Sequence, residues 1–388
     1  MKKFLEIYQN FRAVFVTAIA FLVVFIIYEF FTMSFSIFSP VKTIMQDFSI
    51  THFFYEIGRK EPQLNSFITI VDMTDLVKRG DLARVLRQIE EAEPKVIGVD
   101  MVFKGERDDS IGNQEITQVA RDYDNIIWSL RLDNNISTSQ DYDYYYRSFF
   151  IEETGAKEGV TNMMGSKLGR MKSKLSHGWR IGDEILPSFV TAVVNYWAEE
   201  ELVPVEEKEE NINYRPTKFE VVDWRAVEDN QDLLADRIVL FGAMHDDVDM
   251  HSTPLGKMAG LQTLAYAIQT VVVRENSIRE VSGFKLFIYS FLIVMITFIL
   301  RSRRVQWVNS RKSSLARLLL GFPVVGSFIS FLWVAFLMYG AYLLFDVYDI
   351  SFNLTFAFSA IAFLGTAENS YNIIRGYINE KTNAKNNF

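Results

Sequence analysis

The stretch VLFGAMHDDVDMHSTPLGKMAGL, residues 239–261, decides how the rest of this chain is interpreted. Its apolar run ends at Gly242, and the following loop places three Asp and two His within seven residues. Thr253 and Pro254 then lead to Gly260, after which a helical pattern begins. A buried strand followed by a polar loop commonly delivers side chains to the edge of a sheet. The stretch therefore predicts a strand, a polar loop and a helix in an α/β fold.

Two further buried strands are predicted upstream. SFITIVDM contains Asp72 near its end, and KVIGVDMVF carries Asp100. Between them, residues 80–93 have apolar side chains at helical spacing, and Pro94 ends that helix. A strand, a helix and a second strand form a β-α-β unit with parallel strands. With a third strand at 125–132, the pattern predicts a three-layer α/β domain with a mixed, largely parallel sheet.

Four apolar segments are long enough to cross a membrane, one before the predicted α/β domain and three after it. The composition agrees, because 49% of the residues are hydrophobic and 33 are Phe. A bilayer core about 30 Å thick needs roughly 20 helical residues. No small-residue cleavage pattern follows the first segment, so it predicts an uncleaved anchor rather than a signal peptide. The predicted transmembrane helices are 13–35, 284–300, 318–345 and 350–367.

Charges beside the apolar segments predict their orientation. Residues 301–317 contain six Lys and Arg and no acid, whereas the turn between the last two segments carries Asp346 and Asp349. Basic loops tend to remain in the cytoplasm, so residues 36–283 are expected outside it. The pattern predicts a multi-pass protein of a bacterial inner membrane. The segments expected in the cytoplasm are 1–12, 301–317 and 368–388.

The expected external domain is acidic, with 42 Asp and Glu against 27 Lys and Arg in residues 36–283. This charge argues against nucleic acid as a partner. It is compatible with cations or basic partners, and equally with a soluble domain held away from anionic lipid. The absence of Cys excludes disulfides and thiolate chemistry but not export. A basic cluster is interpreted as a solvated hairpin. Its residues are Lys167, Arg170, Lys172 and Lys174.

Several short motifs occur in an order that is similar to one family. They are a strand ending at Asp72, VIGVDMVF with Asp100, NYR at 213–215, IVLFG at 238–242, and D-x-H-S-T-P at 249–254 followed by Gly260. With one span before the domain and three after it, this set resembles the second class of CHASE extracytoplasmic sensor domains of bacterial receptors. The resemblance implies a ligand or structural signature. Its residues are Asp72, Asp100, Asn213, Arg215, Asp249, His251, Thr253 and Pro254.

The Asp/His-rich loop also raises the hypothesis of a metal site, because imidazole and carboxylate groups can bind divalent cations. The candidates are His245, Asp247, Asp249 and His251. Since parallel strands end at one edge of a sheet, Asp72 and Asp100 could share a rim with this loop. The structural alternative is that these residues cap helices and brace loops. The sequence therefore assigns no metal, cofactor or small-molecule ligand.

The sequence predicts no built-in output domain. Only 21 residues follow Ala367, fewer than the roughly 50 that a domain needs, and no P-loop, G-x-G-x-x-G or H-E-x-x-H motif occurs. We expect a membrane-anchored sensor or scaffold subunit rather than an enzyme, with the lipid bilayer and either a protein partner or further copies of itself as partners. The alternatives are a purely structural assembly factor of an envelope complex and, less favoured, an external hydrolase.

Overall fold

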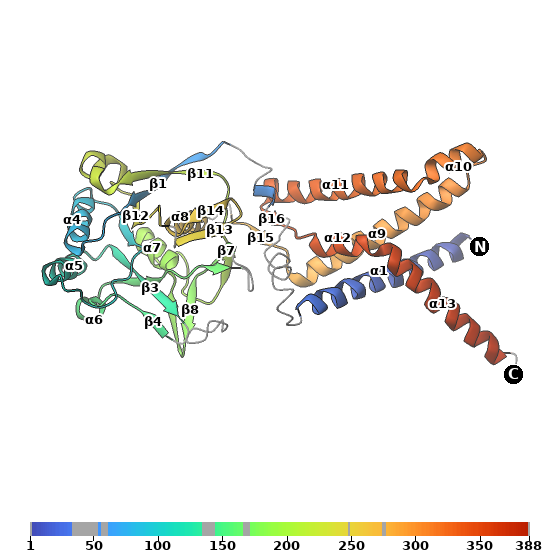
Figure 1. The fold of residues 1–388 in the computed structure, drawn as a ribbon, viewed down its shortest axis with the longest axis horizontal. Helices are drawn as coiled ribbons and strands as arrows, with labels where there is room; N and C mark the ends of the chain where they lie inside the picture. The colour runs from blue at the N-terminus through green and yellow to red at the C-terminus, as the bar shows by residue number, and fades with distance from the viewer. Residues whose placement is uncertain are drawn as a thin grey trace. The chain divides into compact units, whose positions relative to one another are not determined.

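The structure is a computed structural model that describes residues 2–32, 53–55, 61–133, 144–165, 171–246, 249–273 and 277–386. It separates into two compact units (Figure 1). Tyr55–Ile278 form a mixed α/β unit. Met1–Phe54 and Arg279–Phe388 form a second unit that consists mainly of helices. These are called the α/β unit and the helical unit.

One seven-stranded sheet organises the α/β unit. Its strands are β1 (Gln63–Asp72), β2 (Val96–Val99), β3 (Ile126–Asp133), β4 (Tyr144–Tyr146), β5 (Glu158–Val160), β11 (Thr217–Asp223) and β12 (Ile238–Gly242). The order is β11-β1-β12-β2-β3-β4, and β5 also pairs with β3. All these pairs are parallel except β3 with β4. The predicted mixed sheet and its parallel β-α-β strands are confirmed.

Two amphipathic helices, α4 (Arg79–Glu90) and α5 (Ser110–Asp122), pack against each other and on one face of this sheet. The apolar side of α4 is buried as its spacing predicts. Its buried apolar residues are Leu82, Ala83, Val85, Leu86 and Ile89. The core on this face surrounds Trp128, whose ring meets Phe150 edge-on at a centroid distance of 4.8 Å. Burial of this apolar surface stabilises the strand-helix pairing.

Glycines in two central strands allow α7 (Phe189–Ala198) and α8 (Gly260–Val272) to approach the sheet. A Cβ at Gly98 of β2 would lie 2.7 Å from the Phe189 ring. A Cβ at Gly242, the last residue of β12, would lie 3.0 Å from the Leu261 side chain. Because Gly242 ends its strand, this close contact places the start of α8 at the carboxyl edge of the sheet.

A hairpin of β13 (Met250–Thr253) and β14 (Gly256–Ala259) leads directly into α8, with His251 opposite Met258. A bridge between Met171 and Ser252 joins this hairpin to the segment that precedes β7. The remaining short elements are α6 (Ile151–Thr154), β6 (Met164–Gly165), β7 (Lys172–Ser176), β8 (Gly178–Ile181), β9 (Glu184–Pro187), β10 (Glu209–Asn211), η2 (Trp224–Ala226) and η3 (Glu228–Leu233).

Three helices among the described residues are long and apolar enough to cross a membrane. They are α1 (Lys2–Thr32), α9 (Gly283–Asn309) and α11 (Pro323–Tyr348). Pro323 begins α11, where its missing N–H would in any case have no helical partner. Between α9 and α11 lies the short helix α10 (Ser314–Gly321).

The predicted fourth span is not confirmed. Residues 350–367 comprise β16 (Ile350–Ser351), α12 (Thr355–Ala362) and the start of α13 (Leu364–Asn386). Neither helix meets the length and hydropathy that a span requires. Of the four predicted transmembrane helices, three are therefore supported among the described residues.

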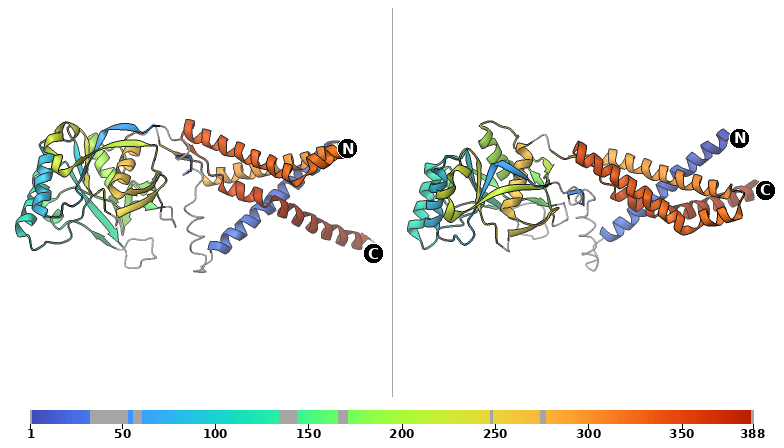
Figure 2. Two further views of the ribbon diagram at one scale, coloured as in Figure 1. Left: turned by 45° about the horizontal axis from the view of Figure 1, so that its top comes forward. Right: turned by 90° about the horizontal axis from the view of Figure 1, so that it is seen from above.

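The first helix packs against the last within the helical unit (Figure 2). Arg12 Nη2 of α1 lies 2.6 Å from Glu368 Oε1 of α13. The Arg12 guanidinium also lies over the Phe298 ring of α9, 5.6 Å from its centroid. At its other end, the unit has a short parallel pair between β16 and β15 (Arg279–Glu280). The contacts of Arg12 therefore link the segment before the α/β unit to the segments after it.

Candidate functional site

Five ionisable side chains surround a cavity of about 170 Å³ at the carboxyl edge of the parallel sheet. They come from the ends of β2 and β3, the start of β7, the residue before β13, and β13 itself. We call this cavity the mixed-charge pocket. Its ionisable residues are Asp100, Arg131, Lys172, Asp249 and His251. Open α/β sheets bind ligands at this edge, so the position suits a binding site.

Asp100 follows β2 and faces the second carboxylate of the pocket. Burial is the main cause that raises the pKa of Asp100 to about 6, and the negative charge of Asp249 raises it further. A 3.4 Å hydrogen bond from Ser129 Oγ and the charges of His251 and Arg131 act in the opposite direction. The pocket thus holds two carboxylates whose repulsion a bound cation would relieve.

Asp249 lies at the N-terminus of α8. A Cβ at Gly260, the first residue of that helix, would collide with the Asp249 carboxylate, so only glycine leaves room for it. A carboxylate in this place is stabilised by the positive end of the helix dipole. The Asp249 Oδ1 atom also lies 3.4 Å from Nε2 of His251. Asp249 therefore packs against the start of α8 and also lines the pocket.

Lys172 and Arg131 supply the positive charges of the pocket. Lys172 Nζ donates a 2.8 Å hydrogen bond to the Met163 carbonyl, which uses one of its three donors. Burial, followed by repulsion from Arg131, lowers the pKa of Lys172. Lys172 does lie in an antiparallel strand pair, since β7 pairs with β6, but its side chain is half-buried and lines the pocket rather than being solvated as the sequence predicted. Lys167 and Arg170 of that predicted hairpin lie outside the described residues.

Asp72 does not line this pocket. It accepts hydrogen bonds from the Thr74 N–H at 2.9 Å, the Thr74 hydroxyl at 2.6 Å and the Met244 N–H at 3.0 Å. The other oxygen of the Asp72 carboxylate lies 3.7 Å from Nε2 of His245. The expected common rim therefore holds Asp100, Asp249 and His251, whereas Asp72 ties the β1 loop to the β12 loop.

The other signature residues brace turns in the structure. The Asn213 N–H donates a 2.9 Å hydrogen bond to Thr270 Oγ1, and the Asn213 Oδ1 accepts one from the Arg215 N–H at 3.0 Å. Thr253 Oγ1 donates to the Gly256 carbonyl at 2.8 Å, which closes the hairpin turn that contains Pro254. None of these four lines the mixed-charge pocket.

The metal hypothesis gains no support from the described residues, which contain no group of three or more His, Cys, Asp or Glu arranged to hold an ion. Two of its candidates, Asp249 and His251, lie together, whereas His245 lies beside Asp72. Asp247 lies outside the described residues. Two carboxylates, an imidazole and two cations suit a charged organic molecule better than a metal ion, because the cations oppose a metal's charge.

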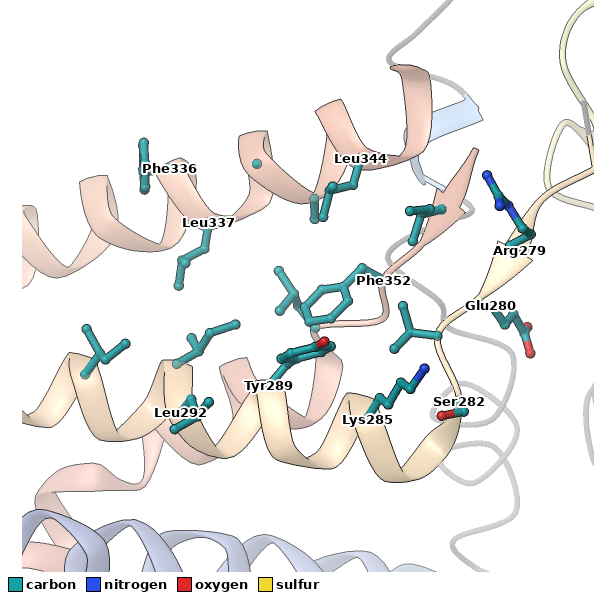
Figure 3. A pocket seen from close by; sticks show the side chains of 17 residues that line it. Arg279, Glu280, Ser282, Lys285, Tyr289, Leu292, Phe336, Leu337, Leu344 and Phe352 are labelled. Carbon is teal, nitrogen blue, oxygen red and sulfur yellow. The ribbon is translucent and has the colours of Figure 1, made fainter. Parts of the chain in front are cut away.

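A larger cavity, of about 780 Å³, lies in the helical unit between α9 and α11 (Figure 3). Its walls are mainly apolar, with Tyr289 and Leu292 on α9 and Leu337 and Leu344 on α11. The polar residues of its lining lie at one end and are Arg279, Glu280, Ser282 and Lys285. Between helices that could cross a membrane, such a surface suits lipid chains or another helix. It offers few polar groups to orient a small polar ligand, so its greater size does not make it the better candidate site.

Comparison with known proteins identifies the family. A family model described as the CHASE2 domain matches residues 19–300, well over half of the chain. No curated protein and no solved structure matches the chain. The match confirms the resemblance that the ordered motifs indicated, from the strand ending at Asp72 to Gly260. The chain belongs to the CHASE2 family of extracytoplasmic sensor domains.

Proposed function

We propose that this protein is a membrane-anchored sensor subunit whose mixed-charge pocket binds a small polar molecule and whose helical unit passes the signal to a separate protein. The observation that carries the proposal is the pocket itself. In a sensor family, it brings together predicted residues Asp100, Asp249 and His251 at the carboxyl edge of the sheet. Sensing rather than catalysis is the role we assign to it.

The size and charges of the pocket define the molecule that fits. A volume of about 170 Å³ corresponds to roughly six water molecules at about 30 Å³ each. Asp100 and Asp249 suit an ammonium group, while Arg131 and Lys172 suit a carboxylate or another acidic group. A small zwitterion would satisfy both charged sides at once. A molecule with one charge would leave the opposite side unpaired, which costs binding free energy.

Helix α8 offers a route for the signal. It begins at Gly260, against the Asp249 carboxylate, and ends at Val272, and the chain enters the apolar helix α9 at Gly283. A ligand that changes the charge at the start of α8 favours one position of that helix over another. A small shift of a helix is a common way to connect a binding site with a distant element.

The membrane arrangement is part of the same proposal. We place residues 36–283 outside the inner membrane of a bacterium as a three-layer domain, and the basic segment 301–317 in the cytoplasm. The apolar helices α1, α9 and α11 support a membrane location. A fourth crossing over residues 350–367 would return the chain to the cytoplasm. The partner then contacts the basic segment or α13.

Purification from native membranes in a mild detergent tests this function. Wild-type protein is expected to bring a cytoplasmic partner with it, and neutralising the six basic residues of 301–317 is expected to remove that partner. Loss of the partner only on changes within residues 36–283 would instead favour a structural assembly factor. A homo-oligomer with no partner would contradict the proposal. Turnover of esters or phosphoesters by the purified protein would favour the hydrolase.

A further inference from the structure

A second polar cavity, of about 410 Å³, lies beside the first turn of α4 and the segment that follows β2. Its charged lining residues are Arg79, Lys104 and Arg107, and we call it the basic pocket. No acidic side chain lines it. This is unusual in a segment, residues 36–283, where acidic residues outnumber basic ones by 42 to 27. The basic pocket shares no lining residue with the mixed-charge pocket.

Arg79 is a buried cation without a carboxylate partner. Only 3% of its surface is exposed. Its guanidinium donates to the Asn113 side-chain oxygen and, at 2.7 Å, to the Gly105 carbonyl, both of which are neutral acceptors. Its Nε has no hydrogen-bond partner, and Arg79 forms no ion pair with the residues that the structure describes. Buried charges in proteins are normally paired, so this arrangement calls for an anion.

The surroundings of Arg79 compensate its charge only in part. The guanidinium lies 4.9 Å from the Phe149 ring centroid and 5.6 Å from that of Phe103, within the range of cation-π attraction. Burial, followed by the positive charge of Arg107, lowers the pKa of Arg79. The negative charges of Asp109 and Glu106 raise it, although neither carboxylate forms an ion pair with Arg79. Neutral oxygens and aromatic faces therefore take the place of a counter-ion.

Two exposed cations, Lys104 and Arg107, line the same cavity as Arg79. Lys104 Nζ lies 3.4 Å from the Tyr146 ring centroid, and Arg107 Nη1 donates to the Val77 carbonyl at 3.3 Å. The first turn of α4 adds to this positive field, because Lys78 at its N-cap provides no side-chain hydrogen bond to the free N–H groups. Three cations and an uncapped helix start thus act on one cavity.

We propose that the basic pocket binds a small organic anion, with its carboxylate or phosphate group at Arg79, Lys104 and Arg107. Leu76, Leu82 and Phe103 line the rest of the cavity and would contact the apolar part of that molecule. Arg79 uses two of its five N–H donors on the protein. The volume falls in the range of small-molecule sites, about 300–1,000 Å³. The site is independent of the proposed sensing of a zwitterion.

Three aromatic probes of similar shape test this assignment on the full chain in detergent. Benzoate and phenyl phosphate are anions, and benzamide is a neutral counterpart of benzoate. At least one of the two anions is expected to bind in isothermal titration and to raise the melting temperature, whereas benzamide is not. Binding is expected to weaken as salt increases. Equal binding of benzamide, or no binding of either anion, would overturn the proposal.

Matched substitutions identify where the anion binds. The double variant Lys104→Ala, Arg107→Ala removes two exposed cations of the pocket and is expected to weaken binding roughly tenfold or more. The control Arg84→Ala, Arg121→Ala removes two exposed cations of α4 and α5 that do not line the pocket. It is expected to leave binding unchanged. An equal loss of anion binding in both variants would mean that the anion is attracted to surface charge in general, and it would overturn the proposal.

Arg79→Met provides an independent check, because it replaces a buried charge by an apolar side chain. This change removes the hydrogen bonds to Asn113 and Gly105 and is expected to lower the melting temperature of the free protein by a few degrees. It is also expected to abolish the anion-induced rise. A rise that persists in folded Arg79→Met protein would contradict the site. If that variant fails to fold, the double variant at Lys104 and Arg107 decides the question.

Discussion

Asp72 and Asp100 end two parallel strands of one sheet, yet they have different roles in the structure. Asp72 accepts three hydrogen bonds from Thr74 and Met244, and its side chain is 14% exposed. Asp100 receives one long hydrogen bond from Ser129, faces Asp249, and lines a cavity. The position at the end of a strand is therefore not enough to place a carboxylate in a cavity. The donors that surround the carboxylate decide whether it braces a loop or remains available to a ligand.

The largest effect on stability is expected at the brace. Asp72→Ala removes three hydrogen bonds and leaves the Met244 N–H without its main acceptor, so we expect a loss of about 2–4 kcal/mol. Thermal unfolding of the full chain in detergent measures it. Asp183→Ala, at an exposed turn, is the control and is expected to have almost no effect. If both variants unfold at the same temperature, Asp72 does not brace the fold.

A smaller effect is expected at the start of α8. Gly260→Ala places a methyl group against the Asp249 carboxylate and is expected to cost about 1–3 kcal/mol by overpacking. It should also weaken ligand binding, because the carboxylate must move. Gly376→Ala is a matched control in α13, where an added Cβ meets nothing within 4 Å. Comparable melting temperatures for the two variants would show that Asp249 does not depend on this glycine.

The raised pKa of Asp100 predicts a dependence of stability on pH. The folded state holds the proton up to a pKa of about 6, whereas the ordinary value is 3.8. The folded state binds more protons in this window, so its stability falls as pH rises from about 4 to about 7. We expect a difference of about 2–3 kcal/mol. If the unfolding free energies of wild type and Asp100→Asn changed in parallel with pH across this range, the raised pKa of Asp100 would be contradicted.

The smallest effect is expected at His251. Its Nε2 lies 3.4 Å from Asp249 Oδ1 at a partly exposed position, and such pairs contribute about 0–1 kcal/mol. His251→Gln retains a hydrogen-bonding side chain and is expected to change the melting temperature by little. A large loss of stability, comparable to that of Asp72→Ala, would show that His251 is a structural brace rather than a pocket residue.

The sequence predicted the parts of the site that follow from strand ends. Apolar runs before Asp100 and in IVLFG predicted parallel strands, and these strands bring Asp100 to the same rim as Asp249 and His251. The sequence could not separate Asp72 from this group, because the difference depends on Met244, which is 172 positions away in the chain. That contact exists only because β1 and β12 are neighbours in the sheet.

The positive side of the mixed-charge pocket could not be predicted. Arg131 lies between Leu130 and Leu132, the alternation typical of an outward-facing position on a strand, and Lys172 lies in a run of basic residues typical of a solvated surface. The role of Arg79 could not be predicted either, because its burial depends on contacts with Asn113 and two Phe side chains from other segments. Long-range packing, rather than local pattern, turns these three common residues into parts of cavities.

Titration of small zwitterions into the full chain tests the central claim most directly. Glycine, alanine and taurine are compared by calorimetry with acetate and methylammonium, which each carry one charge. We predict that at least one zwitterion binds more tightly than either single-charge probe. Asp100→Asn and Arg131→Gln should each weaken it roughly tenfold or more, and Asp183→Asn should not. Equal binding of acetate or methylammonium, or zwitterion binding that survives both pocket substitutions, would contradict the account.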